Sequence, residues 1–144
     1  MAQSYESTEL PASILFVLDR SGSMACNLPP LQDSAACEAT AAPVDGTQKS
    51  KWQITVGALE QVFDSLLMKG STANIGLSFF SNDNTCGVNS TPSVPLGAVT
   101  AAHVASLKTV LDGTIPSGGT PLVGATTLGY AYLHQEAGAT PGCS

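Results

Sequence analysis

Positive charge is scarce in this chain: its 144 residues include five lysine and arginine residues, against eleven aspartate and glutamate residues. The formal net charge is -6 at pH 7. Nucleic acids and anionic membranes are bound largely through clusters of basic side chains. The composition excludes such a basic surface, so we expect neither nucleic acid nor an anionic membrane as a partner.

Long apolar runs are also absent, because no stretch reaches the roughly 18 apolar residues that a membrane-spanning helix needs. The first residues are mostly polar and have neither a basic start nor an apolar run, unlike a signal peptide. We therefore expect no membrane insertion. The predicted organisation is a polar N-terminal segment at 1–11 and a single domain at 12–144.

The motifs of common hydrolases and nucleotide-binding proteins are missing. No Gly-x-Ser-x-Gly elbow surrounds a serine, and there is no Gly-Lys-Ser/Thr phosphate-binding loop. His103 and His134 lie on different predicted helices, without the spacing of a metal-binding pair. We expect the protein not to be an enzyme.

Cysteine is used sparingly, and no Cys-x-x-Cys or Cys/His pairing of a zinc site is present. The four cysteines are Cys26, Cys37, Cys86 and Cys143. We expect disulfides, with Cys26 and Cys37 able to close one loop and the other two left as a pair, although sequence cannot choose among three connectivities. Disulfides indicate an extracellular, cell-surface or periplasmic location, with any export signal outside this chain. The alternative is four inert thiols in a cytoplasmic protein.

Hydrophobic periodicity predicts alternating strands and helices. The expected strands are Ile14–Leu18, Asn74–Phe80 and a short edge strand at Ser93–Val99. The first expected helix is Lys51–Lys69, and the second is capped by Thr100 and ends near Asp112-Gly113. The third runs from Pro121 to about Glu136. The Cys-containing segment 24–50 is expected to be a long loop, and Asn82-Asp83-Asn84 a turn and not a calcium loop. Trp52 is expected in the core. The predicted inner face of the last helix is Leu122, Ala125, Leu128 or Gly129, and Tyr132 or Leu133.

Oxygen ligands follow the first predicted strand. Its run of branched and aromatic residues is typical of a strand buried on both faces, and Asp19, Ser21 and Ser23 come directly after it. One carboxylate and two hydroxyls suit Mg²⁺, Mn²⁺ or Ca²⁺ better than zinc. The alternative is that Asp19 and Ser21 only satisfy backbone groups in a turn or cap a following helix. Arg20 is expected to be a solvated side chain at the rim of this loop. The other interpretation is that it attracts an acidic group of a ligand.

A second group of small residues, Ser117-Gly118-Gly119-Thr120-Pro121, precedes the last predicted helix. Thr120 fits the N-cap position, and Pro121 fits the first helical position because it needs no N–H there. The Thr120 hydroxyl could complete the shell of a cation, with the glycines allowing close approach of the backbone.

In this order and at this separation, the two motifs resemble the von Willebrand factor type A family with its metal-ion-dependent adhesion site. The resemblance runs from about residue 12 to the C-terminus. It implies a Rossmann-like α/β fold, with a mostly parallel central sheet of six strands flanked by helices. It also implies that Ser21, Ser23 and Thr120 coordinate the metal directly, while Asp19 acts mainly through bound water.

The chain departs from that family at its C-terminal end. No Thr-Asp-Gly motif follows Thr120, and Glu136 is the only later acidic residue. The C-terminal strands of the family are missing, which would leave an exposed apolar edge on the first strand. We therefore expect either a missing C-terminal part or a partner that donates a strand.

The leading hypothesis is a protein-binding module of the adhesion type, in which a divalent cation bridges to a carboxylate of a protein ligand. One alternative is an intracellular subunit that uses the same site for docking during assembly. A further alternative is a Mg²⁺-dependent hydrolase with Asp19 as base or nucleophile.

Overall fold

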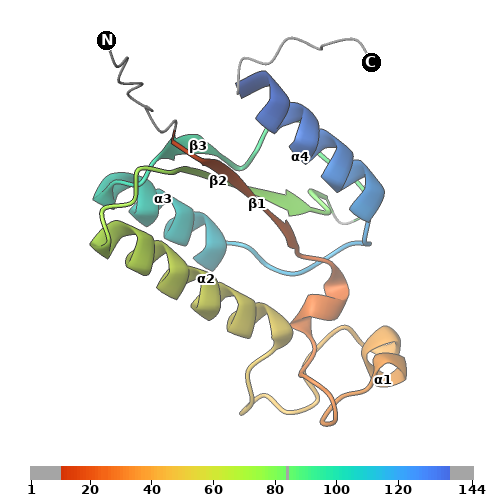
Figure 1. The fold of residues 1–144 in the computed structure, drawn as a ribbon. Coiled ribbons are helices and arrows are strands. Elements are labelled where there is room, and N and C mark those ends of the chain that lie inside the picture. Colours follow the sequence, from red (N-terminus) through yellow and green to blue (C-terminus); the bar gives the residue numbers. More distant parts are fainter. Residues whose placement is uncertain (1–10, 84, 137–144) are drawn as a thin grey trace, which may run out of the picture.

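The computed structural model describes residues 11–83 and 85–136 (Figure 1). Of the expected polar segment at 1–11, only residue 11 is described. Cys143, and with it the expected pairing of Cys86 and Cys143, lies outside the described residues. In chain order the elements are β1 (Ser13–Asp19), the 3-10 helix η1 (Gly22–Ala25), α1 (Ser34–Ala39), α2 (Lys51–Met68), β2 (Asn74–Phe80), β3 (Val94–Ala98), α3 (Ala101–Asp112) and α4 (Leu122–Glu136).

The three strands form one mixed sheet in the order β1-β2-β3. β1 and β2 run parallel and in continuous register from Ser13 opposite Asn74 to Asp19 opposite Phe80. β3 runs antiparallel to β2, with an irregularity between Ile75 and Leu77. The parallel pair is joined through α2, the kind of crossover that parallel strands need. The described residues between β2 and β3 contain no helix, so the chain turns back and β3 lies antiparallel.

This architecture corrects the predicted fold class. The sequence indicated a Rossmann-like sheet that is mostly parallel, whereas the structure is a small α/β unit in which one strand pair is parallel and the other antiparallel. The positions of the three strands were predicted well. The parallel direction of β1 and β2 agrees with the prediction, but the antiparallel direction of β3 does not, because direction depends on the connection and not on the strand itself.

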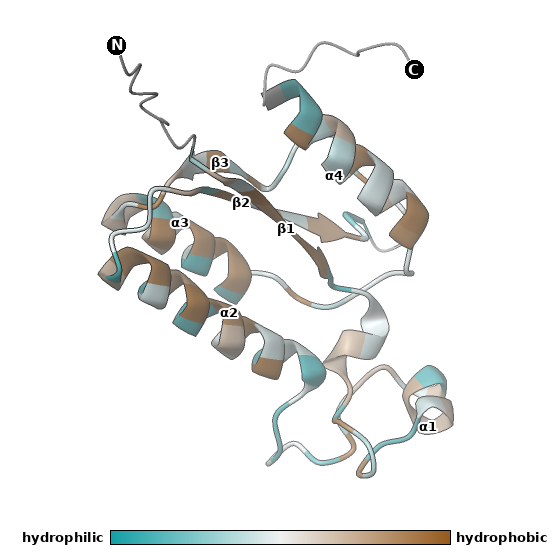
Figure 2. Cartoon of the chain, viewed as in Figure 1, coloured by the Kyte–Doolittle hydropathy of each residue, from teal (hydrophilic) through white to brown (hydrophobic). Residues whose placement is uncertain are grey.

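Helices cover both faces of the sheet, with α2 and α3 on one side and α4 on the other (Figure 1). Between the sheet and the pair α2 and α3 lies the core, in which Phe63, Ile75, Leu77, Leu107 and Leu111 are fully buried. The faces of these elements that look inward are mostly apolar (Figure 2). Trp52 is buried and its ring centroid lies 6.0 Å from that of Phe79, which confirms its predicted place in the core.

Local signals in the sequence explain the ends of α2 and α3. Ser50 and Gln53 form a reciprocal capping box at the start of α2, and Gly70 follows its end with a φ of 61°. The Thr100 hydroxyl accepts the His103 N–H at 3.2 Å and caps α3 as predicted. His103 itself packs at the edge of the core, with Nε2 2.7 Å from the Ile75 carbonyl oxygen.

Helix α4 packs on β1 and β2 through small residues. Ala125 is buried, and a Cβ added to Gly129 would lie 3.2 Å from the Val17 side chain. The Tyr132 hydroxyl accepts the Leu96 N–H at 3.1 Å. Leu122, predicted on the inner face, is instead 58% exposed, because α4 begins at this residue and its first turn extends beyond the sheet.

Strand β1 is less buried than its sequence indicated. Its residues from Leu15 to Asp19 are half-buried, Ser13 and Ile14 are exposed, and nearly all of β2 is buried. The reason is its place at the edge of the sheet, with β2 as its neighbour. None of the described helices is long and apolar enough to cross a membrane.

Candidate functional site

The candidate site begins where β1 ends. The Ser21 N–H donates to the Asp19 carboxylate at 2.7 Å, and the hydroxyls of Ser21 and Ser23 lie 3.3 Å apart. Ser21 is buried and Ser23 is exposed at the first turn of η1. This hydrogen bond gives Asp19 the turn-forming role that was the alternative to a metal-binding role. One of its two carboxylate oxygens is therefore already occupied by the Ser21 N–H.

The structure brings the second predicted motif to the same place. The Gly22 N–H donates to the Gly118 carbonyl at 3.0 Å, and the Ser117 N–H donates to the Arg20 carbonyl at 2.7 Å. Gly118 has a φ of 83°, a conformation that side chains rarely allow. Two segments far apart in the sequence are thereby joined by backbone hydrogen bonds.

Thr120 lies beside this junction but not in the helix-capping role assigned to it. It is exposed, its carbonyl accepts the Leu122 N–H at 2.8 Å, and α4 begins at Leu122. The first helical bond of α4 runs from the Ala125 N–H to the Pro121 carbonyl. Pro121 therefore precedes the helix, one position earlier than predicted, and Thr120 lies two residues before its first residue.

Arg20 is a structural crosslink, contrary to the prediction of a solvated side chain. Its guanidinium donates to the carbonyls of Ser81, Asp83 (3.1 Å) and Ile115 (3.4 Å) and to the Ser117 hydroxyl (3.2 Å). Two loops, one after β2 and one before α4, are thus held to the end of β1. The planar guanidinium has five N–H donors, so it can serve several carbonyls at once.

The turn after β2 is organised by one carboxylate. Asp83 accepts hydrogen bonds from the Thr85 and Gly87 N–H groups at 2.8 and 2.9 Å and from the Thr85 hydroxyl at 2.8 Å. The Gly87 N–H is the main cause of a pKa for Asp83 below its ordinary value of 3.8, followed by the Thr85 N–H and hydroxyl. This confirms the prediction of a turn for the described residues of this segment.

The loop 24–50 is folded, although no regular structure was predicted in it. It contains α1, which Asp33 caps by accepting the Ala36 N–H at 2.8 Å, and Cys26 and Cys37 form a disulfide. The predicted pairing of these two cysteines is confirmed. Cys86 is exposed and free in the described part of the chain.

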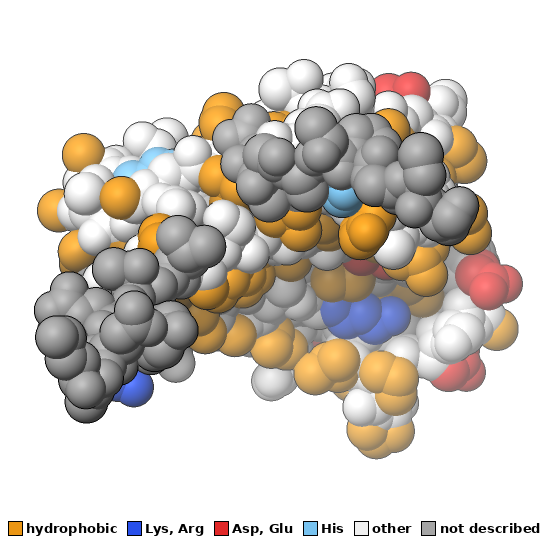
Figure 3. Space-filling view, turned by 45° about the horizontal axis from the view of Figure 1, so that its top comes forward, with side chains coloured by type: hydrophobic (Ala, Val, Ile, Leu, Met, Phe, Trp, Pro, Cys, Tyr) orange, Lys and Arg blue, Asp and Glu red, His pale blue; other side chains and the backbone are white. Residues whose placement is uncertain are grey.

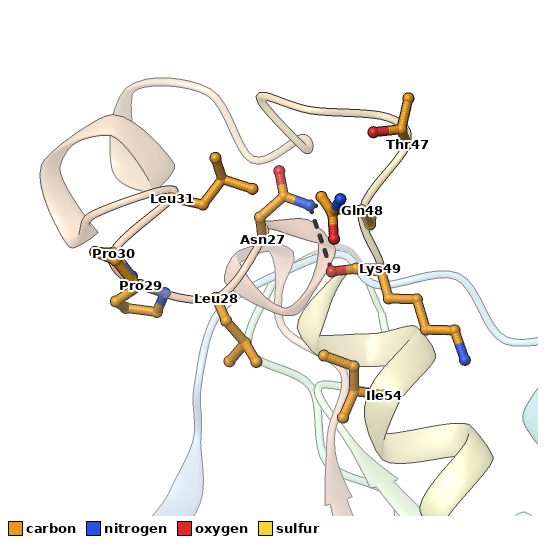
Figure 4. A pocket seen from close by; sticks show the side chains of 9 residues that line it. All are labelled: Asn27, Leu28, Pro29, Pro30, Leu31, Thr47, Gln48, Lys49 and Ile54. Carbon is orange, nitrogen blue, oxygen red and sulfur yellow. Dashed lines mark hydrogen bonds between the residues drawn. The ribbon is translucent and has the colours of Figure 1, made fainter.

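Buried Asn27 is the polar centre of that loop. Its side-chain amide donates to the carbonyls of Asp45 (3.3 Å), Gln48 (3.2 Å) and Lys49 (3.4 Å), and its side-chain oxygen accepts the Asp45 N–H at 3.0 Å. A pocket of about 540 Å³ opens beside it (Figure 4). The pocket is lined by Asn27, Leu28, Pro29, Pro30, Leu31, Thr47, Gln48, Lys49 and Ile54. Sequence reasoning missed both Asn27 and this pocket, because a buried amide has no distinctive spacing.

Besides the Asp19 carboxylate and several hydroxyls, the described junction holds the Arg20 guanidinium and, beside Gly119, the Cys86 thiol. The described residues contain no group of three or more His, Cys, Asp or Glu side chains that could hold a metal ion. The Ser21 and Ser23 hydroxyls lie 3.3 Å apart, whereas the Asp19 carboxylate accepts the Ser21 N–H.

Comparison with known proteins places the fold among pilus proteins. The chain is similar to the pilus adhesin SpaC from Lactobacillus rhamnosus GG, with 20% identity and a TM-score of 0.52 over 79% of this chain and 12% of that one. It is also similar to the PilB minor pilin from Streptococcus sanguinis, with 18% identity and a TM-score of 0.61 over 96% of this chain and 29% of that one. No family model matches the chain, and no curated protein matches it.

These findings correct the assignment to the von Willebrand factor type A family. The structural neighbours are a pilus adhesin and a minor pilin, and no model of that family or any other matches. The short motifs that carried the resemblance consist of Asp, Ser, Gly and Thr, which are the residues that any tight turn uses. In this structure they do form turns, joined by the Gly22 and Gly118 bond. The chain spans under a third of the length of either neighbour.

Proposed function

We propose that this chain is a non-enzymatic, adhesion-type module that binds protein at a cell surface, as a component of a pilus. The observation that carries the proposal is its likeness in fold to a pilus adhesin over 79% and to a minor pilin over 96% of its length. The Cys26–Cys37 disulfide supports a location outside the cytoplasm, because such bonds persist in oxidising compartments. It also speaks against the alternative of an intracellular docking subunit.

Binding can be tested with the labelled chain on an array of immobilised, purified surface and matrix proteins. The heat-unfolded chain is the control for non-specific adsorption. We expect saturable binding of the folded chain to at least one protein and none by the unfolded chain. Absence of saturable binding across the array, for a chain shown to be folded, would contradict the adhesive role.

The finer part of the proposal is that the β1 end holds a divalent cation. Ser21, Ser23 and Thr120 would supply hydroxyl ligands and Asp19 would act mainly through bound water, with a carboxylate of the protein ligand completing the shell. The 3.3 Å between the Ser21 and Ser23 hydroxyls and the attachment of Gly118 to Gly22 support this arrangement. Mg²⁺ is the first choice and Mn²⁺ or Ca²⁺ the others, because all three prefer oxygen ligands.

Thermal unfolding with Mg²⁺, Mn²⁺, Ca²⁺ or EDTA tests the cation separately from adhesion. A ligand that binds only the folded chain stabilises it by about 2.7 kcal/mol at a hundred times its Kd. We expect a stabilisation that Asp19→Asn and Thr120→Ala abolish and that Thr127→Ala, on the exposed side of α4, retains. Equal melting with cation and with EDTA would remove the cation and leave the protein-binding proposal standing.

A further inference from the structure

The Arg20 guanidinium is a positive centre at the end of β1. It donates to the carbonyls of Ser81, Asp83 and Ile115 and to the Ser117 hydroxyl. All four acceptors are neutral, so they take up its N–H groups without cancelling its charge. Basic side chains are sparse on the face of the molecule that Figure 3 shows, where hydrophobic and neutral side chains prevail. A positive charge held in place is therefore a local feature that a negatively charged group can recognise.

The two carboxylates beside Arg20 are engaged in turns. The Asp19 carboxylate accepts the Ser21 N–H at 2.7 Å. Asp83 offers its backbone carbonyl to Arg20, while its carboxylate accepts three hydrogen bonds within its own turn. Among the described residues, neither carboxylate forms an ion pair with the guanidinium. The charge of Arg20 is thus not taken up by these two neighbours.

A small pocket of about 230 Å³ opens beside the guanidinium. Its wall combines Arg20 with the amides of Asn82 and Asn89, the hydroxyls of Ser93 and Thr114, and apolar side chains such as Phe79. Two of the carbonyls that Arg20 binds belong to the residues on either side of Asn82, and a third belongs to the residue after Thr114. The guanidinium is therefore held against this wall by the chain neighbours of its other members.

Hydrogen-bond donors besides Arg20 line the same pocket. Asn89 and Ser93 are both exposed. With the Asn82 amide oriented to satisfy its neighbours, its oxygen accepts one Asn89 side-chain N–H at 2.9 Å. An amide nitrogen carries two N–H groups, so the second one of Asn89 can serve a ligand, as can the Ser93 hydroxyl. Arg20 contributes Nη1, whose bond to the Ile115 carbonyl is the longest of its four, at 3.4 Å.

These features suit one carboxylate group. Sites for small molecules usually enclose about 300–1,000 Å³, so a pocket of about 230 Å³ has room for the end of a single side chain. Hydrogen bonds between a guanidinium and a carboxylate are shorter and about twice as strong as those between neutral groups. The amide and hydroxyl donors favour the same ligand, because an ionised carboxylate only accepts hydrogen bonds.

We propose that this pocket binds a carboxylate of the protein partner, from an Asp or Glu side chain on its surface, with Arg20, Asn89 and Ser93 as donors. The inference rests on the proposed protein-binding function. It requires no metal, so it is separate from the cation considered at Ser21 and Ser23. The bonds that hold the guanidinium in place also lower the conformational entropy that binding would otherwise cost.

An NMR titration in the presence of EDTA tests the pocket with two blocked peptides, acetyl-Gly-Glu-Gly-amide and acetyl-Gly-Gln-Gly-amide. We expect the glutamate peptide to shift the Arg20 Nε–H and Asn89 side-chain signals saturably, with a Kd on the order of 1–10 mM. The glutamine peptide has the same shape without the charge and should bind at least tenfold more weakly.

Two results of this titration would overturn the proposal. One is equal binding of the two peptides, or shifts that leave the Arg20 and Asn89 signals in place. The other is tighter binding of inorganic phosphate than of the glutamate peptide at the same signals, which would assign the pocket to a phosphate group.

Asn89→Asp blocks the pocket while Arg20 and its crosslinks remain. It places a carboxylate in the pocket wall, and we expect the affinity for the glutamate peptide to fall at least tenfold. Gln61→Glu adds the same charge at an exposed residue of α2 outside the pocket and should leave the affinity unchanged. Circular dichroism on both variants checks that the fold is retained. Equal affinities of Asn89→Asp and the parent chain would contradict the assignment.

The protein array separates this inference from the proposed function. We expect Asn89→Asp to lose binding to the array protein that the parent chain binds, and Gln61→Glu to keep it. If Asn89→Asp binds that protein as the parent does, only the carboxylate pocket is overturned and the adhesive role stands. If the folded parent chain binds nothing on the array, the adhesive role is overturned and the pocket's protein partner with it.

Discussion

Arg20 and Ser117 are bonded to each other twice. The Ser117 N–H donates to the Arg20 carbonyl at 2.7 Å, and the Arg20 guanidinium donates to the Ser117 hydroxyl at 3.2 Å. The backbone and the side chain of one residue thus hold the segment before α4. Since the same guanidinium also reaches the Ser81 and Asp83 carbonyls, the loops around the candidate site depend on one side chain.

Removing that side chain should loosen the whole junction. We expect Arg20→Ala to lower the free energy of unfolding by about 1–3 kcal/mol, because carbonyls that it now satisfies lose their donor. Arg20→Lys should recover part of the loss, since an ammonium cannot serve as many acceptors in one plane. Urea unfolding measures both, with Lys49→Ala at an exposed position as control. A loss no larger than that of Lys49→Ala would show that the crosslink does not contribute to stability.

Gly118 should tolerate no side chain. A Cβ there would overlap the Ser81 hydroxyl and lie 2.7 Å from the Asp83 carbonyl oxygen, at a φ of 83° that disfavours alanine. We expect Gly118→Ala to destabilise the protein by more than about 1 kcal/mol. Gly46→Ala is the matched control, because nothing lies within 4 Å of the position that its new methyl group would take. Chemical unfolding of the two variants measures the difference in stability between them. Equal denaturant midpoints for Gly118→Ala and Gly46→Ala would mean that the loop relaxes freely around Gly118.

The Cys26–Cys37 disulfide should contribute substantially to stability. It closes a loop with a sequence separation of 11, for which about 2–3 kcal/mol of stabilisation is expected. The double variant Cys26→Ala, Cys37→Ala should lose that amount in urea unfolding, and Cys86→Ser, at a cysteine that is exposed and free among the described residues, should lose nothing measurable. A stable double variant would indicate that the Asn27 hydrogen bonds alone maintain the loop.

Acid should weaken the turn at Asp83. Its pKa is depressed in the folded chain, chiefly by the Gly87 N–H, so its contribution to stability is complete above pH 3.8 and disappears as the pH falls through the lower, folded value. Melting temperatures measured between pH 2 and 6 should therefore show a smaller acid-induced drop for Asp83→Asn than for the parent chain. Glu38→Gln, on the exposed surface of α1, is the control. Parallel curves for the parent and Asp83→Asn would rule out this source of pH dependence.

Much of the secondary structure could be predicted from the sequence, because it depends on local signals. The bounds of β2 match the prediction, and α2 and α3 begin at Ser50 and Thr100 caps that the sequence displays. The antiparallel direction of β3 was not predicted, because it depends on how a polar connection folds. The short helix α1 was missed as well, since six residues give too little periodicity to recognise.

The candidate site was predicted in part. The two motifs around Ser21 and Thr120 do lie side by side, as the backbone bond between Gly22 and Gly118 shows. The family drawn from them was wrong, and Arg20 was assigned to solvent although it is the centre of a network. The role of Arg20 could not be predicted from its neighbours in the sequence, because its hydrogen-bond partners belong to loops that are distant in the sequence.

Inside the loop 24–50, the buried amide of Asn27 and the Cys26–Cys37 bond form a frame that holds the backbone. The exposed side chains around this frame form a covering. Leu28, Leu31 and Val44 are about half exposed and belong to the covering. Their side chains can change in size and chemistry while the frame keeps its shape. The outer surface of the loop can thus diverge in sequence while the bonds that fold it are kept.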